Sequence, residues 1–287
     1  MREKFQVEHF GRLGDRMDSI KKAAIAIKEA KYLLITAGAG MGVDSGLPDF
    51  RGNEGFWRAY PIAKKLGLNF QALANPTWFD INPSLAWAFY GHRLNLYRNT
   101  TPHEGFKVLK NLPHNKFVFT SNVDGQFQKA GFDEEKIVEI HGSIHYLQCT
   151  LPCCEEIWEN KEIVRVDMER FRALDIPKCK FCKRVARPNI LMFGDFRFVE
   201  KRVNEQLNRY ASWLRGIDDK LVIVEIGAGK AVPTVRLESE RIRELFGATL
   251  IRINPRESDG GDIEISLGAK EALLKIAAFM LQFEKRI

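Results

Sequence analysis

The sequence predicts an α/β fold, with a doubly wound, mostly parallel sheet and a second, smaller lobe. Short apolar, β-branched runs alternate with amphipathic stretches of helical period along most of the chain. Loops rich in glycine, asparagine or aspartate directly follow several of these runs. Ligand loops occupy that position at the carboxyl ends of parallel strands. Five cysteines fall between Cys149 and Cys182, and they indicate a separate module inserted into the alternating pattern.

The elements of this fold are placed by composition and period. Strands are predicted at Leu33–Thr36, Phe117–Thr120, Ile137–Ile140, Leu221–Ile226, Thr249–Ile253 and Ile263–Ser266. Apolar residues recur at helical spacing in three longer segments, Ser19–Ala30, Ser84–Arg98 and Ala269–Glu284. Pro188–Phe193 is a further extended apolar run. Strands alternating with helices in this way predict a parallel sheet covered on both faces.

Two interruptions of the alternation define the smaller lobe. We predict a Rossmann-like main domain from residues 19–50, 85–148 and 185–287. The insertions at 51–84 and 149–184 are predicted to form a lobe with a helical module and a cysteine module. Residues 1–18 are predicted to be an N-terminal extension.

Composition excludes several classes of protein. The chain has 287 residues, of which 45% are hydrophobic and 28% charged, as in ordinary globular proteins. No apolar run approaches the roughly 18 residues of a membrane span, and the charged N-terminus lacks the apolar core of a secretory signal. We therefore expect a cytoplasmic protein without a membrane partner. The net charge of +7 is spread along the chain, so no specific nucleic-acid partner is expected.

The cysteines indicate a structural metal centre. Their odd number and clustering argue against a disulfide framework. Cys179 and Cys182 form a two-residue knuckle, and Cys149 pairs with Cys153 or Cys154 at a spacing that tetrahedral zinc accepts. The sequence leaves that choice open. We favour Cys154, so that Cys149, Cys154, Cys179 and Cys182 hold a structural Zn²⁺ whose closed coordination sphere leaves no catalytic position.

Three loops carry the candidate site. GAGMGVDSGLPDFRG spans Gly38–Gly52, TSNVDGQF spans Thr120–Phe127 and EIHGS spans Glu139–Ser143, each after a predicted strand. Glycines at such a turn let the backbone approach a pyrophosphate, and helix N–H groups bind the anion. A hydride-transfer fingerprint would need an acidic residue about 20 residues after the glycines. None ends a clear second strand here, so a Rossmann dehydrogenase fits poorly.

In this order, the three loops resemble those of the sirtuins, which are NAD-consuming deacylases and ADP-ribosyltransferases. The resemblance runs from about Ile20 to Leu274. It implies an NAD-dependent protein-lysine deacylase that acts on acyl-lysine proteins or peptides and produces nicotinamide and O-acyl-ADP-ribose. The acyl group would be acetyl, or succinyl or malonyl in a variant specificity. The family also has a structural zinc held by four cysteines at the place of the cysteine module.

Two positions depart from the usual sirtuin pattern. Gly42 stands where most members have Ser, and Ser121 stands where most have Gln. The chain therefore resembles a divergent, bacterial-type member of the family. These departures support an alternative outcome of the same chemistry, mono-ADP-ribosyl transfer or NAD hydrolysis. A non-catalytic NAD-sensing module is a third reading, against which the intact His141 and the Asn122–Asp124 pair argue.

The resemblance assigns roles to residues of this chain. His141 is the base that deprotonates a ribose hydroxyl, while Asn122 and Asp124 hold the nicotinamide region and its ribose or water. The cofactor-binding set adds Ala37, Gly38, Ala39, Asp49, Phe50, Arg51, Ser121, Gly227, Ala228, Gly229 and Asn254.

The resemblance also implies a peptide-binding segment and an acyl pocket. Met192, Phe193 and Gly194 lie in a segment expected to add the substrate peptide as a strand. Tyr90 and Arg93 are three residues apart, which places them on one helix face. In sirtuins that remove succinyl or malonyl groups, a Tyr-x-x-Arg pair binds the distal carboxylate of the acyl group, and guanidinium and phenol groups suit that ligand.

Overall fold

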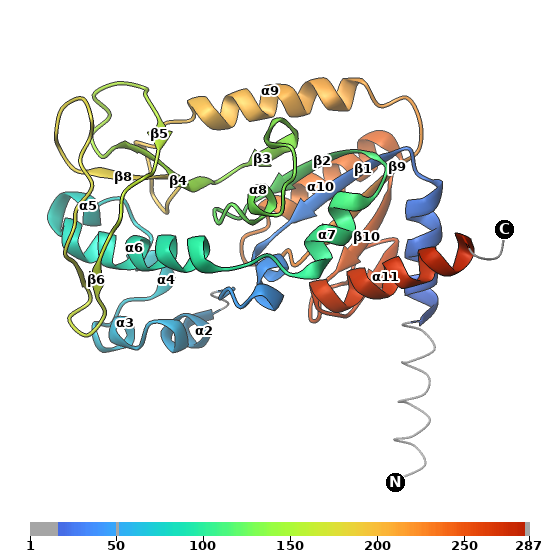
Figure 1. Cartoon of the computed structure of the whole chain (residues 1–287), viewed down its shortest axis with the longest axis horizontal. Helices are drawn as coiled ribbons and strands as arrows, with labels where there is room; N and C mark the ends of the chain where they lie inside the picture. Colours follow the sequence, from blue (N-terminus) through green and yellow to red (C-terminus); the bar gives the residue numbers. More distant parts are fainter. Residues whose placement is uncertain (1–16, 50–51, 285–287) are drawn as a thin grey trace, which may run out of the picture.

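The structure, a computed structural model, describes residues 17–49 and 52–284 and has the predicted α/β fold (Figure 1). Its main sheet has six strands in the order β11-β10-β9-β1-β2-β3, and all neighbours in it are parallel. The strands are β1 (Tyr32–Ala37), β2 (Asn115–Thr120), β3 (Ile137–Glu139), β9 (Leu221–Ile226), β10 (Thr249–Ile253) and β11 (Ile263–Ile265). Each coincides with a predicted strand to within one or two residues at its ends.

The extended run at Pro188–Phe193 differs from the prediction. Strand β8 (Ala186–Ile190) ends three residues earlier and pairs antiparallel with β4 (Gly142–Cys149), outside the main sheet. β5 (Trp158–Glu159) completes this three-stranded sheet, and β6 (Val166–Asp167) pairs with β7 (Arg172–Ala173). The pairing carries the chain from the main sheet into the cysteine module and back.

Helices cover both faces of the main sheet (Figure 1). Residues 17–29, α7 (Glu104–Asn111) and α11 (Ala269–Glu284) lie on one face, and α9 (Lys201–Arg215) and α10 (Thr234–Phe246) lie on the other. Shorter helices are η1 (Ala39–Ser45), α8 (Gln126–Lys129) and η2 (Glu134–Lys136). In the part of the chain that is described, no helix is long and apolar enough to cross a bilayer.

The alternation of side chains along the strands divides the core in two. In β1, Leu33 and Ile35 belong to one buried cluster, while Leu34 belongs to the cluster on the opposite face. Successive side chains of a strand point to opposite faces, so a continuously apolar strand packs against both helical layers. Thr36, a buried polar side chain of β1, is satisfied by a hydrogen bond with Ser239 of α10 at 2.8 Å.

A third cluster, rich in aromatic rings, fills the smaller lobe. Its helices are α2 (Gly52–Ala59), α3 (Pro61–Lys65), α4 (Phe70–Leu73), α5 (Trp78–Ile81) and the long α6 (Pro83–Asn99). Phe89 of α6 lies edge-on to Phe56 and Tyr60, with ring centroids 6.1 and 5.1 Å apart. The buried side chains of α6 thus join this cluster, although residues 85–148 were assigned to the main domain. The division into domains stays a prediction.

Backbone packs directly on backbone where the loops after β1 and β9 meet. Gly227 has φ of +63°, in the left-handed region, and a Cβ there would lie 2.4 Å from Cα of Gly40. A Cβ on Gly38 would lie 2.7 Å from the carbonyl oxygen of Gly227. Gly40 N donates to this same oxygen at 3.0 Å. These glycines are therefore required by the contact between two loops, before any ligand is considered.

We expect Gly227→Ala to destabilise the fold more than a left-handed glycine alone explains. Gly247 offers a matched control because its φ is +60° and nothing lies within 4 Å of a Cβ there. Gly247→Ala should cost about 1 kcal/mol of unfolding free energy from backbone strain. Gly227→Ala should cost at least about 2 kcal/mol more from overpacking. Urea unfolding measures both, and equal losses would show that the loop contact carries no weight.

Candidate active site

Loops that follow five strands of the main sheet meet at its carboxyl edge. Gly38 N donates to the carbonyl of Ile226 at 3.0 Å, which joins the loop after β1 to the end of β9. Gly227 N donates to the carbonyl of Ile253 at 2.9 Å, which joins the loop after β9 to β10. Parallel strands place all these ends in one crevice. The predicted convergence of the three motif loops at one edge therefore follows from the topology.

The first motif loop forms a short 3₁₀ helix, η1. Ala39 lies exposed in it, and Gly38 and Ala37 are buried behind. The helix is capped by Gly46, which has φ of +87°, and N–H groups at this end of the helix donate to its last carbonyls. Asp49 lies at the end of the described part of this loop and pairs with Arg256 at 3.6 Å. Two predicted site residues, Phe50 and Arg51, lie outside the described residues.

Asn122 and Asp124 have different partners in the loop after β2. The Asn122 amide Nδ2 donates to the carbonyl of Gly38 at 2.9 Å and so ties this loop to η1. The Asp124 carboxylate accepts a hydrogen bond from Gln126 N at 2.9 Å, at the start of α8. Ser121 contributes backbone contacts, since its N–H donates to the carbonyl of Ala37 at 3.2 Å.

Asp124 is the most perturbed carboxylate of the site. Burial raises its pKa from 3.8 to about 6, and the charge of Glu139 adds to the shift. The hydrogen bond from Gln126 and the positive charge of Arg93 oppose it. A carboxyl group in a buried loop whose pKa is raised towards neutral pH is typical of a functional site. Its ionisation costs free energy that the rest of the fold must supply.

His141 lies at the end of β3, between the loop after β2 and the start of α10. Its Nε2 is 3.3 Å from Oγ1 of Thr234. Burial lowers the pKa of His141, and a hydrogen bond to the Ser121 backbone opposes this shift. The imidazole is therefore neutral at pH 7, which is the form that accepts a proton. Sequence reasoning missed Thr234, although its place at the start of a helix after β9 was a usable signal.

The loops after β9 and β10 are joined by an asparagine. Nδ2 of Asn254 donates to the carbonyl of Ala228 at 2.9 Å. Its Oδ1 accepts from the backbone N–H groups of Arg256 and Glu257, both at 3.1 Å. The Asn254 side chain thus holds the two loops together, and a Cβ on Gly229 would lie 3.4 Å from the Glu257 carboxylate.

The predicted peptide-binding segment leaves β8 beside the base. Leu191 N donates to the carbonyl of His141 at 2.9 Å, so this segment and the base are directly connected. Phe193 N donates to the carbonyl of Ala74 at 3.0 Å, so this donor already has a partner. Met192 N approaches the Asp195 carboxylate at 3.3 Å. Gly194 then turns the chain with φ of +68°.

The Asp195 carboxylate is held by a fully buried ion pair. Its Oδ2 lies 2.7 Å from the guanidinium of Arg187, and both side chains are inaccessible to solvent. Because a buried charge is tolerated only when it is paired, the pair fixes the 191–195 turn relative to β8.

Tyr90 and Arg93 lie on α6 inside the aromatic cluster of the smaller lobe. The Arg93 guanidinium donates from Nε and Nη2 to the Tyr97 hydroxyl, at 2.9 and 2.8 Å. It also faces the rings of Phe89, Tyr90 and Tyr97 within 6 Å. Burial raises the pKa of Tyr90 to about 12. Tyr97, one helical turn after Arg93, was missed, and its i+4 spacing was the signal that could have found it.

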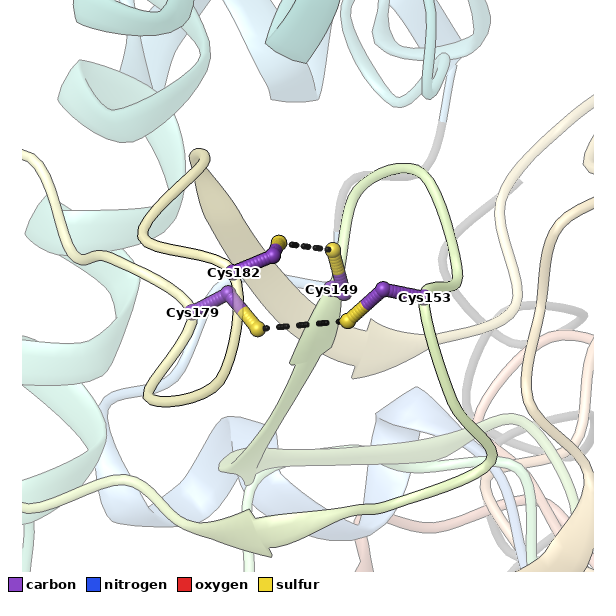
Figure 2. Close-up of side chains that lie close together, drawn as sticks. All are labelled: Cys149, Cys153, Cys179 and Cys182. Atoms are coloured by element: carbon purple, nitrogen blue, oxygen red, sulfur yellow. Dashed lines mark hydrogen bonds between the residues drawn. The ribbon is translucent and has the colours of Figure 1, made fainter.

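Four cysteine thiols converge in the smaller lobe (Figure 2). The sulfur atoms of Cys149, Cys153, Cys179 and Cys182 all lie within 4.8 Å of one another. Cys149 Sγ is 3.6 Å from Cys182 Sγ, and Cys153 Sγ is 3.7 Å from Cys179 Sγ. Tetrahedral zinc with bonds of about 2.3 Å separates its sulfur ligands by about 3.8 Å. The cluster therefore fits a structural zinc.

The choice of Cys154 as the fourth ligand is corrected by this arrangement. Cys153 belongs to the cluster, while the Cys154 sulfur lies outside it, 3.8 Å from that of Cys153. The tight turn after β4, closed by the Cys149 thiol on the carbonyl of Leu151 at 2.8 Å, presents Cys153 to the knuckle.

Comparison with known proteins decides the family. The Sir2 family model matches residues 38–230, more than half of the chain. The chain belongs to the Sir2 family. An NAD-dependent protein deacylase of Leptospira interrogans serogroup Icterohaemorrhagiae serovar Lai is 32% identical over 84% of the chain and 89% of the relative. NAD-dependent protein deacylase 1 of Archaeoglobus fulgidus is 29% identical over 83% and 87%.

Solved structures of Sir2 proteins share the fold. A Sir2 homologue in complex with NAD matches with a TM-score of 0.70 and 25% identity, covering 91% of this chain and 94% of that one. A mutant Sir2 homologue in complex with ADP-ribose matches with the same TM-score and identity over 92% and 97%. In this Sir2 protein, the roles of the individual site residues stay predictions.

We expect Asp124→Asn to stabilise this Sir2 protein while impairing its site. The folded pKa of about 6 lies above the unfolded 3.8, so ionisation is penalised above pH 6 and not below pH 4. A shift of about two pKa units corresponds to up to about 3 kcal/mol at pH 7. The asparagine keeps an oxygen for Gln126 N and cannot ionise. Urea unfolding at pH 7 and pH 4 should show the gain only at pH 7.

The matched control for this prediction is Asp133→Asn. Asp133 is an exposed aspartate that also caps a helical turn, accepting from Glu135 N at 3.0 Å. It should give no gain at either pH. A loss of stability of equal size at both pH values for Asp124→Asn would contradict a penalised charge.

We also expect the fifth cysteine to be dispensable for zinc. Cys153→Ser should lose the bound metal and lower the melting temperature, because three thiolates leave the tetrahedral site open. Cys154→Ser should keep both. Zinc content after dialysis against a chelator, measured by mass spectrometry, checks this directly. Retention by Cys153→Ser with loss by Cys154→Ser would restore the assignment made from the sequence.

Proposed function

We propose that this protein is an NAD-dependent protein-lysine deacylase, which transfers an acyl group from lysine to ADP-ribose. Nicotinamide and O-acyl-ADP-ribose would be the products. The observation that carries the proposal is the position of His141, which lies half-buried beside Thr234 at the edge where the three motif loops meet. The curated relatives named NAD-dependent protein deacylase support it. NAD and ADP-ribose are bound by two of the similar Sir2 structures, which supports NAD as the second substrate.

Different loops of this chain would contact different parts of the NAD molecule. The backbone of η1 and of residues 227–229 would face the diphosphate and adenosine ribose, with Asn254 holding their loops together. Asn122 and Asp124 would hold the nicotinamide end, where burial excludes water. Breaking the glycosidic bond leaves positive charge on the ribose, and an ionised Asp124 would stabilise that charge. Phe50 and Arg51 are proposed to cover this end.

His141 would then act as general base on a ribose hydroxyl. Its neutral state leaves one ring nitrogen unprotonated, and Thr234 beside Nε2 would orient the ring. The substrate lysine would enter past Met192, Phe193 and Gly194. The direct hydrogen bond from Leu191 N to the carbonyl of His141 would couple the peptide's position to that of the base.

The acyl pocket is proposed to lie against α6. Arg93 is buried among aromatic rings, and its positive charge opposes the raised pKa of Asp124. Its charge would therefore act on the proposed nicotinamide end. A succinyl or malonyl carboxylate that reached Arg93 would compete for the hydrogen bonds now given to Tyr97. The structural zinc would brace this lobe, and no catalytic step is assigned to it. We also propose a cytoplasmic location, which the five free cysteines support.

Nicotinamide release from NAD by the purified protein tests the proposal. It is measured with acetyl-, succinyl- and unmodified lysine peptides, for the wild type and for His141→Ala. Release that depends on the acyl-peptide, and falls by at least about 100-fold in the variant, is expected for a general base of this kind. Arg93→Met should reduce turnover of the succinyl peptide more than that of the acetyl peptide.

Other outcomes of the same assay favour other functions. Release that ignores the peptide would replace the deacylase with an NAD glycohydrolase, or with a mono-ADP-ribosyltransferase if a protein becomes labelled. Tight NAD binding without nicotinamide release, whichever peptide is added, would indicate a sensing module.

Thr77→Ala is a suitable control variant for this assay, because the Thr77 side chain caps nothing at the start of α5.

A further inference from the structure

A second histidine lies beside the loop that carries Asn122 and Asp124. His145 is on β4, four residues after His141, and its Nε2 is 2.9 Å from the carbonyl oxygen of Asp124. A carbonyl only accepts, so Nε2 must carry the proton. Burial lowers the pKa of His145, which keeps the ring neutral with this single N–H.

The ring also fills the space above Gly125. A Cβ on Gly125 would lie 2.6 Å from Cδ2 and 2.8 Å from Nε2 of His145. Gly125 has φ of +68°, so the chain reverses there immediately before α8. The edge of the imidazole that carries Cδ2 and Nε2 therefore lies against Gly125, and Nε2 contacts the carbonyl of the residue before it.

An irregularity in β4 places His145 there. The pairing of β4 with β8 shifts between Ser143 and Leu147, so the residues between them are not paired with β8. Ile144 N instead donates to the carbonyl of Val123 at 3.0 Å. Consecutive residues of β4 thus hold consecutive residues of the loop, one through the backbone and one through the imidazole. Bulges near active sites commonly re-aim a side chain in this way.

Asn160 fixes the bulge from its other side. Its backbone N–H donates to the carbonyl of His145 at 2.7 Å, and its Nδ2 donates to that of Ile144 at 3.1 Å. The Asn160 carbonyl in turn accepts from the guanidinium of Arg98. The backbone that carries the imidazole is consequently held in place by these hydrogen bonds.

We propose that His145 is a positioning residue for nicotinamide release, holding the Asn122–Asp124 loop in its reactive geometry through the Asp124 carbonyl and Gly125. This inference rests on the proposed function, because the loop matters for turnover only if the protein cleaves NAD. Among the described residues, no hydrogen bond joins His145 to the side chain of Asn122, Asp124 or His141. It acts through the loop.

Turnover of NAD with a saturating acetyl-lysine peptide separates positioning from general stability. His145→Leu removes the donor, and His145→Gln restores an N–H at similar reach. The matched control is His114→Leu, since His114 is equally half-buried and its Nε2 lies 2.8 Å from the carbonyl of Ile27, at the other end of the strands. We expect kcat to fall at least tenfold in His145→Leu, with KM for the peptide unchanged. His145→Gln should recover to within about threefold, and His114→Leu should stay within twofold.

Amide hydrogen exchange in residues 121–126 gives a readout that does not need turnover. It should be faster in His145→Leu than in the wild type, and unchanged in His145→Gln and His114→Leu. If wild type shows no peptide-dependent release, the proposed function fails, and exchange alone decides the loop contact. Unchanged kcat, or unchanged exchange, in a folded His145→Leu overturns the inference. If that variant does not fold, His145→Gln with wild-type stability and at least a tenfold loss of kcat overturns the role of the N–H.

Discussion

Direct backbone contact between the loops after β1 and β9 is the constraint on which the rest of the site depends. Gly40 and Gly227 approach so closely that a Cβ on either would overlap the other's backbone. The contact fixes where η1 begins, and Asn122 then locks the loop after β2 onto η1 through Gly38. Asn254, directly after β10, joins that strand's loop to the loop after β9 through the carbonyl of Ala228. The site is consequently built from loops that hold one another, with the sheet defining only where they start.

Burial then sets the protonation states that the chemistry needs. The same desolvation that raises the pKa of Asp124 lowers that of His141, because each shift disfavours the charged form. The result is that the proposed base, His141, favours its neutral form and that Asp124 ionises only at a cost in free energy. Such an arrangement stores unfavourable free energy in the folded protein, and a substrate with a developing positive charge would relieve it.

The antiparallel sheet connects this centre to the cysteine cluster. Strand β4 starts directly after His141 and ends at Cys149, and β8 leads back from the cysteine module to the Met192–Gly194 turn. A metal at the cluster would therefore hold the far ends of the two strands whose near ends carry the proposed base and the proposed peptide segment. In this way a closed site without catalytic positions would still influence catalysis, by limiting how far β4 and β8 separate.

The sequence by itself determined the strands, the order of the three loops and the family resemblance. These features depend on local period and on residue types at fixed spacing, which the linear chain displays. Only the tertiary structure chose Cys153 over Cys154, since both satisfy the spacing and the direction of a turn selects between them. It alone showed that β8 pairs with β4, because an apolar run in a sequence does not indicate which strand it pairs with. It also set His145 against Gly125, a contact made by a bulge that joins residues 20 positions apart.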